Sequence, residues 1–236
     1  MKPMAEPGLV AGVDGCRGGW IAIVWGGAGM PANPVLCRSF TEVMALAAEI
    51  IAVDMPIGLP KLSSRDAERA VRLILGKRKS SVFSVPARAA FAAGDYREAC
   101  TINRLHSEPP RALSKECFHL FPKIREIDRL MTPDLQDRVF EAHPEVAFRM
   151  MKGEVLRFSK RTQEGEAVRK SLLRKVGFPL DTLPAVKFLR RDVAPDDILD
   201  ASALAWVARR IRDGENERFP AQPIRDARGL RMEINA

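Results

Sequence analysis

Apolar and polar positions near the start of the chain alternate in a way that predicts β-strands. Residues 9–24 are apolar and rich in β-formers except at Gly15–Gly19, which predicts two strands joined by a short hairpin turn. A third strand is expected at Val35–Phe40, and a short buried strand at residues 50–53. This last strand ends at Asp54, immediately before a run of prolines and glycine that stops it.

The first strand also delivers a carboxylate, because Asp14 directly precedes Gly15. A carboxylate at the inner end of a buried strand is costly unless something pairs with it, so Asp14 calls for a metal ion or a cationic group. If the strands that carry Asp14 and Asp54 are neighbours, both side chains lie at one edge of the sheet. The pattern of strand, acid and breaker repeats where residues 138–140 lead to Glu141 shortly before Pro144.

Between the second and third of these acids the sequence becomes helical, basic and rich in breakers. Helical patterns are expected at Arg65–Leu75, Tyr96–Leu105 and Lys123–Leu130, with prolines between them. We therefore expect a helical insertion at about residues 61–135, placed between the fourth and fifth strands.

The last clear element begins after Pro195 and predicts a long helix capped by Asp196. Asp197 and Asp200 are three residues apart, so they share one helix face with apolar residues. The small alanines of this face let the helix approach a sheet closely, which would bring both acids to the sheet's edge.

The amino-acid composition predicts the class of protein and the cellular compartment. The 236 residues are 46% hydrophobic and 29% charged, which is typical of a globular protein. We expect a single domain over residues 9–213 and a polar C-terminal tail over 214–236. No apolar run is long enough to span a membrane, the N-terminus lacks the apolar stretch of a secretory signal, and the four cysteines form no C-x-x-C pair. A soluble cytoplasmic protein is the expectation.

The net charge of +8 is concentrated in two segments, Lys61–Arg88 and Arg149–Lys175, each with a net charge of +6. Two basic segments on a slightly acidic body predict a polyanionic partner, most commonly nucleic acid, although solvated helix faces would give the same pattern. The cations and hydroxyls that could contact phosphates there are Arg78, Lys79, Ser80, Ser81, Lys160 and Arg161.

Each acid has an ordinary alternative explanation as a turn residue, an edge charge or a helix cap. Divalent metal binding explains all of them at once, because Mg²⁺ prefers carboxylate oxygens and its sites are assembled from distant segments. His143, two residues after Glu141, either assists proton transfer or simply packs. There is no G-x-S-x-G motif, and the cysteines and histidines lack zinc spacing.

Several motifs together resemble a known family of predicted RNase H-like nucleases. The resemblance runs in order from Gly12 to Arg210 and is carried by Gly12–Trp20, Val53–Pro60, Ser80–Phe83, Pro122–Glu126, Glu141–Glu145 and Asp197–Ala201. The wider superfamily includes ribonuclease H and the Holliday-junction resolvases. It implies an α/β fold with a mixed five-stranded sheet, strand order 3-2-1-4-5, flanked by helices.

The resemblance also implies a site. Asp14 is similar to the acid of the central first strand, Asp54 to the acid that ends the fourth, and Asp197 and Asp200 to the paired acids of the last helix. Together with Glu141, which belongs to this family's own motif, they would bind Mg²⁺ or Mn²⁺. The cations Arg17 and Lys123, with Arg78 and Lys79, would hold phosphates.

The implied activity is metal-dependent hydrolysis of phosphodiester bonds in DNA or RNA, which makes the protein a hydrolase. Fold does not fix function, so two alternatives remain open. One is an actin-like or sugar-kinase-like phosphotransferase, although a second glycine-rich phosphate loop is absent from the sequence. The other is a non-catalytic nucleic-acid-binding module on the same fold.

Overall fold

The computed structural model describes residues 8–184 and 188–236, which form two compact units. The sheet unit comprises the described parts of Met1–Met55, Asp137–Glu217 and Asn235–Ala236. The helical unit comprises Pro56–Gln136 and Arg218–Ile234. The chain therefore leaves the sheet unit after Met55 and returns to it at Asp137.

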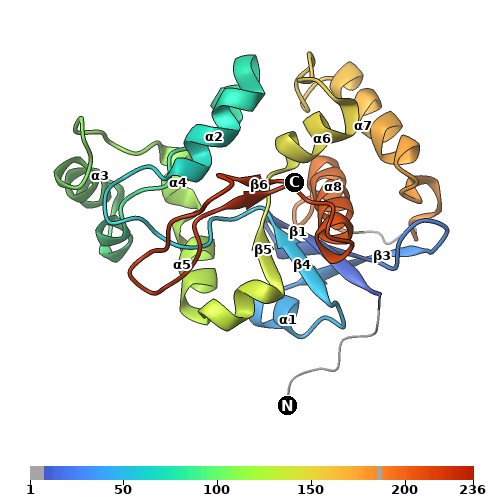
Figure 1. The fold of residues 1–236 in the computed structure, drawn as a ribbon, viewed down its shortest axis with the longest axis horizontal. Helices are drawn as coiled ribbons and strands as arrows, with labels where there is room; N and C mark the ends of the chain where they lie inside the picture. The colour runs from blue at the N-terminus through green and yellow to red at the C-terminus, as the bar shows by residue number, and fades with distance from the viewer. Residues whose placement is uncertain (1–7, 185–187) are drawn as a thin grey trace. The chain divides into compact units, whose positions relative to one another are not determined.

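The sheet unit is built on five strands in the order β3-β2-β1-β4-β5 (Figure 1). Their bounds are β1 Val10–Cys16, β2 Gly19–Trp25, β3 Ala32–Cys37, β4 Ile50–Val53 and β5 Val139–Glu141. Strands β1, β2 and β3 pair antiparallel, whereas β4 runs parallel to both β1 and β5. The sheet is thus mixed, and the predicted fold class and strand order are confirmed.

Helices cover both faces of this sheet. On one face lies α8 (Pro195–Arg212), with α6 (Pro144–Lys152) and α7 (Gln163–Lys175) packed against it. On the other face the ring of Phe40 from α1 (Phe40–Met44) meets the ring of Trp20, with 5.1 Å between ring centroids. A short 3₁₀ turn, η4, spans Leu180–Thr182.

The core of the sheet unit is filled between the sheet and α8. Strand β2 contributes Ile21, Ile23 and Trp25, which are fully buried, and α8 is buried along Leu199–Ala208. Because burial surrounds most of its circumference, α8 lacks the one-sided apolar stripe of a surface helix and behaves as a central core helix.

The helical unit contains α2 (Asp66–Leu75), α3 (Tyr96–Leu105), α4 (Lys115–His119) and α5 (Phe121–Leu130). Three 3₁₀ segments connect them or follow them, namely η1 (Gly76–Ser81), η2 (Arg88–Ala92) and η3 (Pro133–Asp137), the last of which ends at the return to the sheet unit. The predicted helical region between the fourth and fifth strands is therefore present.

The segment after Gly214, expected as a polar tail, carries the short strands β6 (Arg218–Phe219) and β7 (Ile234–Asn235), which pair with each other. Leu230 and Met232 of this segment are buried, so it contributes to the core of the helical unit.

Side chains near two helix starts satisfy open backbone donors. Ser39 caps α1, because its side chain accepts the Glu42 N–H at 3.3 Å. At α8 the N-cap residue is Ala194, and the side chain that satisfies an open backbone donor is that of Asp197 rather than Asp196. In the part of the chain that the structure describes, none of the helices has the length and apolar composition needed to cross a membrane.

Candidate carboxylate site in the sheet unit

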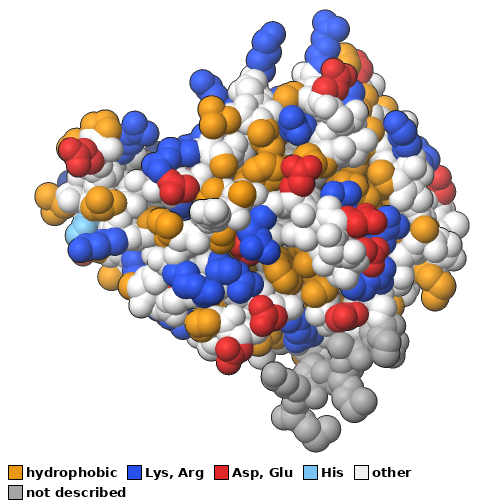
Figure 2. Space-filling view, viewed as in Figure 1, with side chains coloured by type: hydrophobic (Ala, Val, Ile, Leu, Met, Phe, Trp, Pro, Cys, Tyr) orange, Lys and Arg blue, Asp and Glu red, His pale blue; other side chains and the backbone are white. Residues whose placement is uncertain are grey.

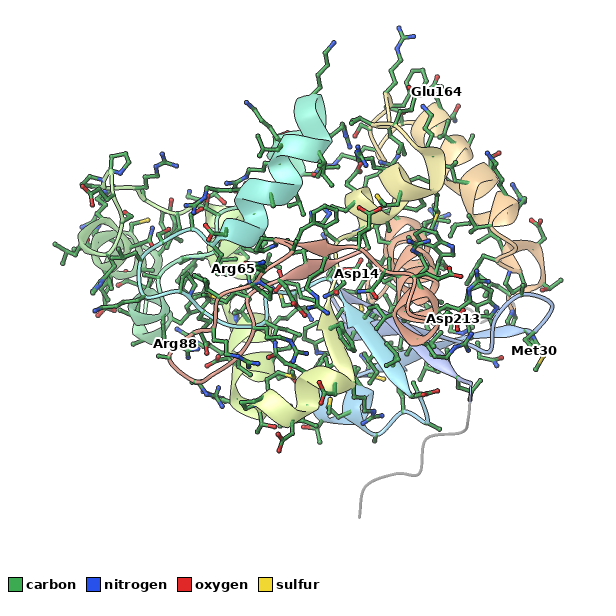
Figure 3. All side chains as sticks on the ribbon, in the orientation of Figure 1. Asp14, Met30, Arg65, Arg88, Glu164 and Asp213 are labelled. Atoms are coloured by element: carbon green, nitrogen blue, oxygen red, sulfur yellow. The ribbon has the colours of Figure 1, made fainter. Side chains whose placement is uncertain are left out.

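The register of two parallel strands brings Asp14 and Asp54 together. Val13 on β1 is the partner of Val53 on β4, and the Asp54 N–H donates to the Val13 carbonyl at 3.0 Å. Asp14 and Asp54 follow these positions by one residue each, so they emerge side by side where the pairing of β1 with β4 ends. Figure 3 labels Asp14 at this point, and its side chain is only 8% exposed.

Glu141 is placed on the other face of the sheet. It is in register with Val53, and directly paired residues on neighbouring strands point to the same face. Asp14 and Asp54 belong to the alternate positions. The structure therefore brings Asp14 and Asp54 together at one face and leaves the buried Glu141 on the face that Val13 and Val53 share.

Helix α8 supplies the next two carboxylates because it lies directly on β1. A Cβ atom built on Gly12 would be 1.9 Å from the Ala205 nitrogen and 2.2 Å from the Ala201 oxygen. Only glycine permits so close an approach. Gly12 shares its sheet face with Asp14, so the first turns of α8 carry Asp197 and Asp200 toward Asp14.

A lysine from the loop between α6 and α7 enters the same cluster. The Lys160 Nζ lies 2.7 Å from Oδ2 of the buried Asp200 and 3.3 Å from Oδ2 of Asp196. The Lys160 side chain is 36% exposed, so its stem reaches in from the surface. We refer to Asp14, Asp54, Asp197, Asp200 and Lys160 as the carboxylate cluster.

The electrostatics of the cluster are dominated by burial and mutual repulsion. Burial, followed by repulsion from Asp54, Asp200 and Asp197, raises the pKa of Asp14 well above its ordinary value, and Lys160 opposes this only in part. Burial also raises the pKa of Asp54, although His143 and Lys160 lower it. The environment of both carboxyl groups therefore favours a proton or an added cation.

The two helix acids show the same imbalance. Burial raises the pKa of Asp200 to about 6 despite its ion pair with Lys160. Burial raises the pKa of Asp197 as well, although the Ala194 N–H donates to its Oδ2 at 2.8 Å and lowers it. Burial disfavours the charge of Lys160, but Asp200, Asp14 and Asp196 outweigh this effect and raise its pKa. Four carboxylates thus share one ammonium group.

His143 adjoins the cluster through Asp54 and has a defined orientation. As N-cap of α6, it accepts the Glu145 N–H at its Nδ1 with a distance of 3.2 Å. A neutral imidazole that accepts at Nδ1 carries its proton at Nε2, which makes Nε2 a hydrogen-bond donor.

A second buried ion pair joins Arg169 of α7 to Glu145 of α6. The guanidinium of Arg169 bonds to the carboxylate of Glu145, and its Nη1 also donates to the Gly165 carbonyl at 3.0 Å. Arg169 is 1% exposed, and its charge lowers the pKa of Asp200. Sequence reasoning missed both partners of this pair. Glu145 belongs to the Glu141–Glu145 motif, whereas Arg169 carries no local signal.

The other predicted contacts lie outside the cluster. Arg17 is exposed in the β1–β2 hairpin and lowers the pKa of Asp197, and Arg161 is exposed next to Lys160. The remaining predicted contacts belong to the helical unit, where η1 carries Arg78, Lys79, Ser80 and Ser81 and α5 carries Lys123.

The donor chemistry of the cluster suits a hard divalent cation. Carboxylate oxygens are the ligands that Mg²⁺ and Mn²⁺ prefer, and the raised pKa values show a local deficit of positive charge. Among the described residues, no three His, Cys, Asp or Glu side chains are arranged so that they already hold one metal ion. Side-chain rotation at Asp14, Asp54 and Asp200 would therefore accompany binding of an ion.

Residues 12–225 match the family described as Protein of unknown function (DUF429). The chain belongs to this family. The match to the DUF429 family includes every member of the carboxylate cluster and most of the helical unit. Neither a curated protein nor a solved structure matches the chain.

Proposed function

We propose that this DUF429 protein is a metal-dependent nuclease of the RNase H-like type, which hydrolyses phosphodiester bonds in DNA or RNA. The observation that carries the proposal is the carboxyl group of Asp14, whose pKa is raised by burial and by three further carboxylates, one directly after β4 and two on α8. The strand order β3-β2-β1-β4-β5 is the order expected for that superfamily and supports the same function.

Asp14, Asp54 and one or both of Asp197 and Asp200 would hold Mg²⁺ or Mn²⁺. When bound, such an ion activates an attacking water and stabilises the leaving oxygen of a phosphodiester. Glu141 is not included in this set, because its register places it on the other face of the sheet. A carboxylate cluster with a net negative charge also repels phosphate, which keeps the substrate away until a cation is present.

Two further groups of the chain have roles in this proposal. Lys160 neutralises Asp200 across 2.7 Å and keeps the cluster folded without an ion. The Nε2–H of His143 lies close to Asp54, from where it can donate a hydrogen bond to a leaving oxygen. The exposed Arg17 and Arg161 lie beside the cluster members Asp197 and Lys160 and would position the phosphate backbone.

The experiment is a cleavage assay on the purified chain with end-labelled single-stranded and double-stranded DNA and RNA. Cleavage is expected with Mg²⁺ or Mn²⁺ and not with EDTA. We expect Asp14→Asn to lower the rate by about 10²- to 10³-fold or more, because it removes a central ligand.

The matched control is Asp213→Asn, at the C-cap of the same helix that carries Asp197 and Asp200 (Figure 3). It makes the same chemical change at the opposite end of α8 and should leave cleavage unchanged. Equal cleavage by wild type and Asp14→Asn would show a contaminating nuclease or a different site and would end the proposal.

The ion pair between Lys160 and Asp200 favours one second candidate, a nucleic-acid-binding module that works without metal. In that case Lys160 supplies the countercharge permanently. Binding of an oligonucleotide measured by fluorescence anisotropy would then be equal in Mg²⁺ and in EDTA and unaffected by Asp14→Asn, with no cleavage in any condition.

A further inference from the structure

The helical unit contains a cavity of about 520 Å³ that has no part in the proposed nuclease chemistry. One part of its wall carries the arginines Arg88, Arg125 and Arg129, and another carries the apolar side chains of Leu59, Phe91 and Ala93. Ligand cavities of small molecules have volumes of roughly 300–1,000 Å³ and combine an apolar wall with a few polar groups. The cavity meets this description.

Both terminal nitrogens of Arg88 bond to acids of the helical unit. Its two terminal nitrogens lie 2.9 and 3.1 Å from the carboxylate oxygens of Asp128, and Nη2 is also 2.5 Å from Oδ2 of Asp226. Asp128 also pairs with Arg228 at 3.3 Å. These contacts neutralise Arg88 and Asp128, so neither brings a net charge to the cavity.

Arg125 is held in place without an acid. Its Nε donates to the Phe91 carbonyl at 2.7 Å and its Nη2 to the Ala93 carbonyl at 2.8 Å. Backbone carbonyls fix the guanidinium but do not cancel its charge. Among the described residues Arg125 makes no ion pair, and the guanidinium edge that includes Nη1 retains donors for a ligand.

Arg129 lies one turn further along α5, on the same helix face as Arg125. It is exposed, and within the part of the chain that the structure describes it forms neither a hydrogen bond nor an ion pair. Figure 2 shows Lys and Arg side chains gathered over the region where Figure 1 draws α5 and the C-terminal segment. Two uncompensated guanidinium groups therefore line one cavity.

We propose that this cavity binds a phosphate monoester of mononucleotide size. Two guanidinium groups match the charge of a phosphate monoester, which is about −1.5 to −2 at neutral pH. Planar guanidinium groups also bind phosphate oxygens in pairs. The space beyond the phosphate adjoins Phe91, whose ring is packed against Phe121 with 4.3 Å between centroids, so an apolar or planar group has a rigid wall to contact.

The same phosphate could come from a free nucleotide or from the 5′-phosphorylated end of a nucleic-acid strand. Isothermal titration calorimetry on the full chain in EDTA distinguishes them, because it reads binding without metal and independently of the carboxylate cluster. The probes are AMP, adenosine, a 5′-phosphorylated tetranucleotide and the same tetranucleotide with a 5′-hydroxyl. We expect AMP to bind at least about tenfold more tightly than adenosine.

Comparable binding of AMP and the phosphorylated tetranucleotide assigns the site to any 5′-phosphate. Binding of AMP alone assigns it to free nucleotides, and binding of the phosphorylated tetranucleotide alone assigns it to strand ends. In each case the 5′-hydroxyl probe must bind more weakly than its phosphorylated counterpart.

Two matched pairs of variants locate the site. Arg129→Gln should weaken AMP binding about tenfold, whereas Arg111→Gln, at an exposed arginine of the same unit that does not line the cavity, should leave it unchanged. Ala92 is exposed at the cavity wall, so Ala92→Glu should weaken binding more than the equally large Ala92→Gln.

The proposal fails if none of the phosphorylated probes binds at millimolar concentration, or if a phosphorylated probe that binds is matched in affinity by its unphosphorylated counterpart. It also fails if Arg129→Gln and Arg111→Gln have the same affinity, or if the glutamate and glutamine variants of Ala92 do. Far-ultraviolet circular dichroism of each variant verifies that the fold is retained.

Discussion

The two units treat buried charge in opposite ways. In the helical unit, Arg65 and Glu68 are 2% and 1% exposed, and Arg65 Nε bonds to Glu68 Oε1 at 2.6 Å. Nη1 of Arg65 donates to the Ile57 and Gly58 carbonyls at 3.0 and 3.2 Å. In the sheet unit, three further carboxylates surround Asp14, and Lys160 is the countercharge of all four. A buried charge that is paired with an opposite charge indicates a structural role. A buried cluster with more carboxylates than cations indicates a binding site.

The largest expected effect comes from breaking the ion pair between Arg65 and Glu68. Glu68→Gln leaves the buried guanidinium of Arg65 without its countercharge and should destabilise the protein by about 3–5 kcal/mol. Urea denaturation followed by circular dichroism measures this, with Glu164→Gln at an exposed position of the sheet unit as control (Figure 3). A loss below about 1 kcal/mol would show that the pair is not structurally important.

The next effect concerns pH in the metal-free protein. Asp200 has an ordinary pKa of 3.8 and a folded pKa of about 6, so between these values the folded state binds more protons than the unfolded state. The contribution of Asp200 to the free energy of unfolding is therefore greatest below about pH 4. It falls by about 2 kcal/mol as the pH rises to 6. Urea midpoints in EDTA at pH 4.5, 5.5 and 6.5 measure the slope, and Asp200→Asn should flatten it. An unchanged slope in the variant would contradict the assignment.

Removing the ammonium group from the cluster should have a smaller effect. Lys160→Gln leaves Asp200 without its partner and should destabilise the metal-free protein by about 1–2 kcal/mol. If the cluster binds metal, Mg²⁺ should then raise the melting temperature of this variant by more than it raises that of wild type. Lys170→Gln, which breaks an exposed pair with Glu166, is the control. Equal shifts with Mg²⁺ would argue against a metal in the cluster.

The smallest effect is a gain in stability. Asp14→Asn removes the carboxylate that experiences the repulsion of three others, so the metal-free variant should be more stable by about 1 kcal/mol. For a chain of this size that raises the melting temperature by about 2–4 °C. Differential scanning calorimetry in EDTA makes the comparison, and a lower melting temperature would mean that Asp14 is well paired after all.

The strands could be predicted because their signals are local, whereas their order was implied only by the family resemblance. Apolar runs that end at Asp14 and Asp54, each followed by a breaker, predicted two strands whose acids would meet if the strands were neighbours, and the structure pairs β1 with β4. Strand β4 agrees with the predicted residues 50–53, and α3 with Tyr96–Leu105. Periodicity and breakers are sufficient for elements of this kind.

Long-range features could not be predicted in this way. Glu141 ends a strand of only three residues, which is too short to show which face it belongs to without its partner Val53. Lys160 was identified only as part of a basic loop, because nothing near it in the sequence reveals that it reaches Asp200. Arg125 was overlooked as a candidate binding residue because its isolation from acids is visible only in three dimensions.

The absence of a side chain at Gly12 also limits how this protein can be altered. A methyl group there would overlap the backbone of α8 near Ala205 and Ala201, so even alanine must push the helix outward. In a library that randomises this position, glycine should be the residue recovered among active variants. The distance between β1 and α8 at Gly12 therefore also sets the distance between Asp14 and Asp200. Any residue that moves the helix away from the strand moves these two carboxylates apart.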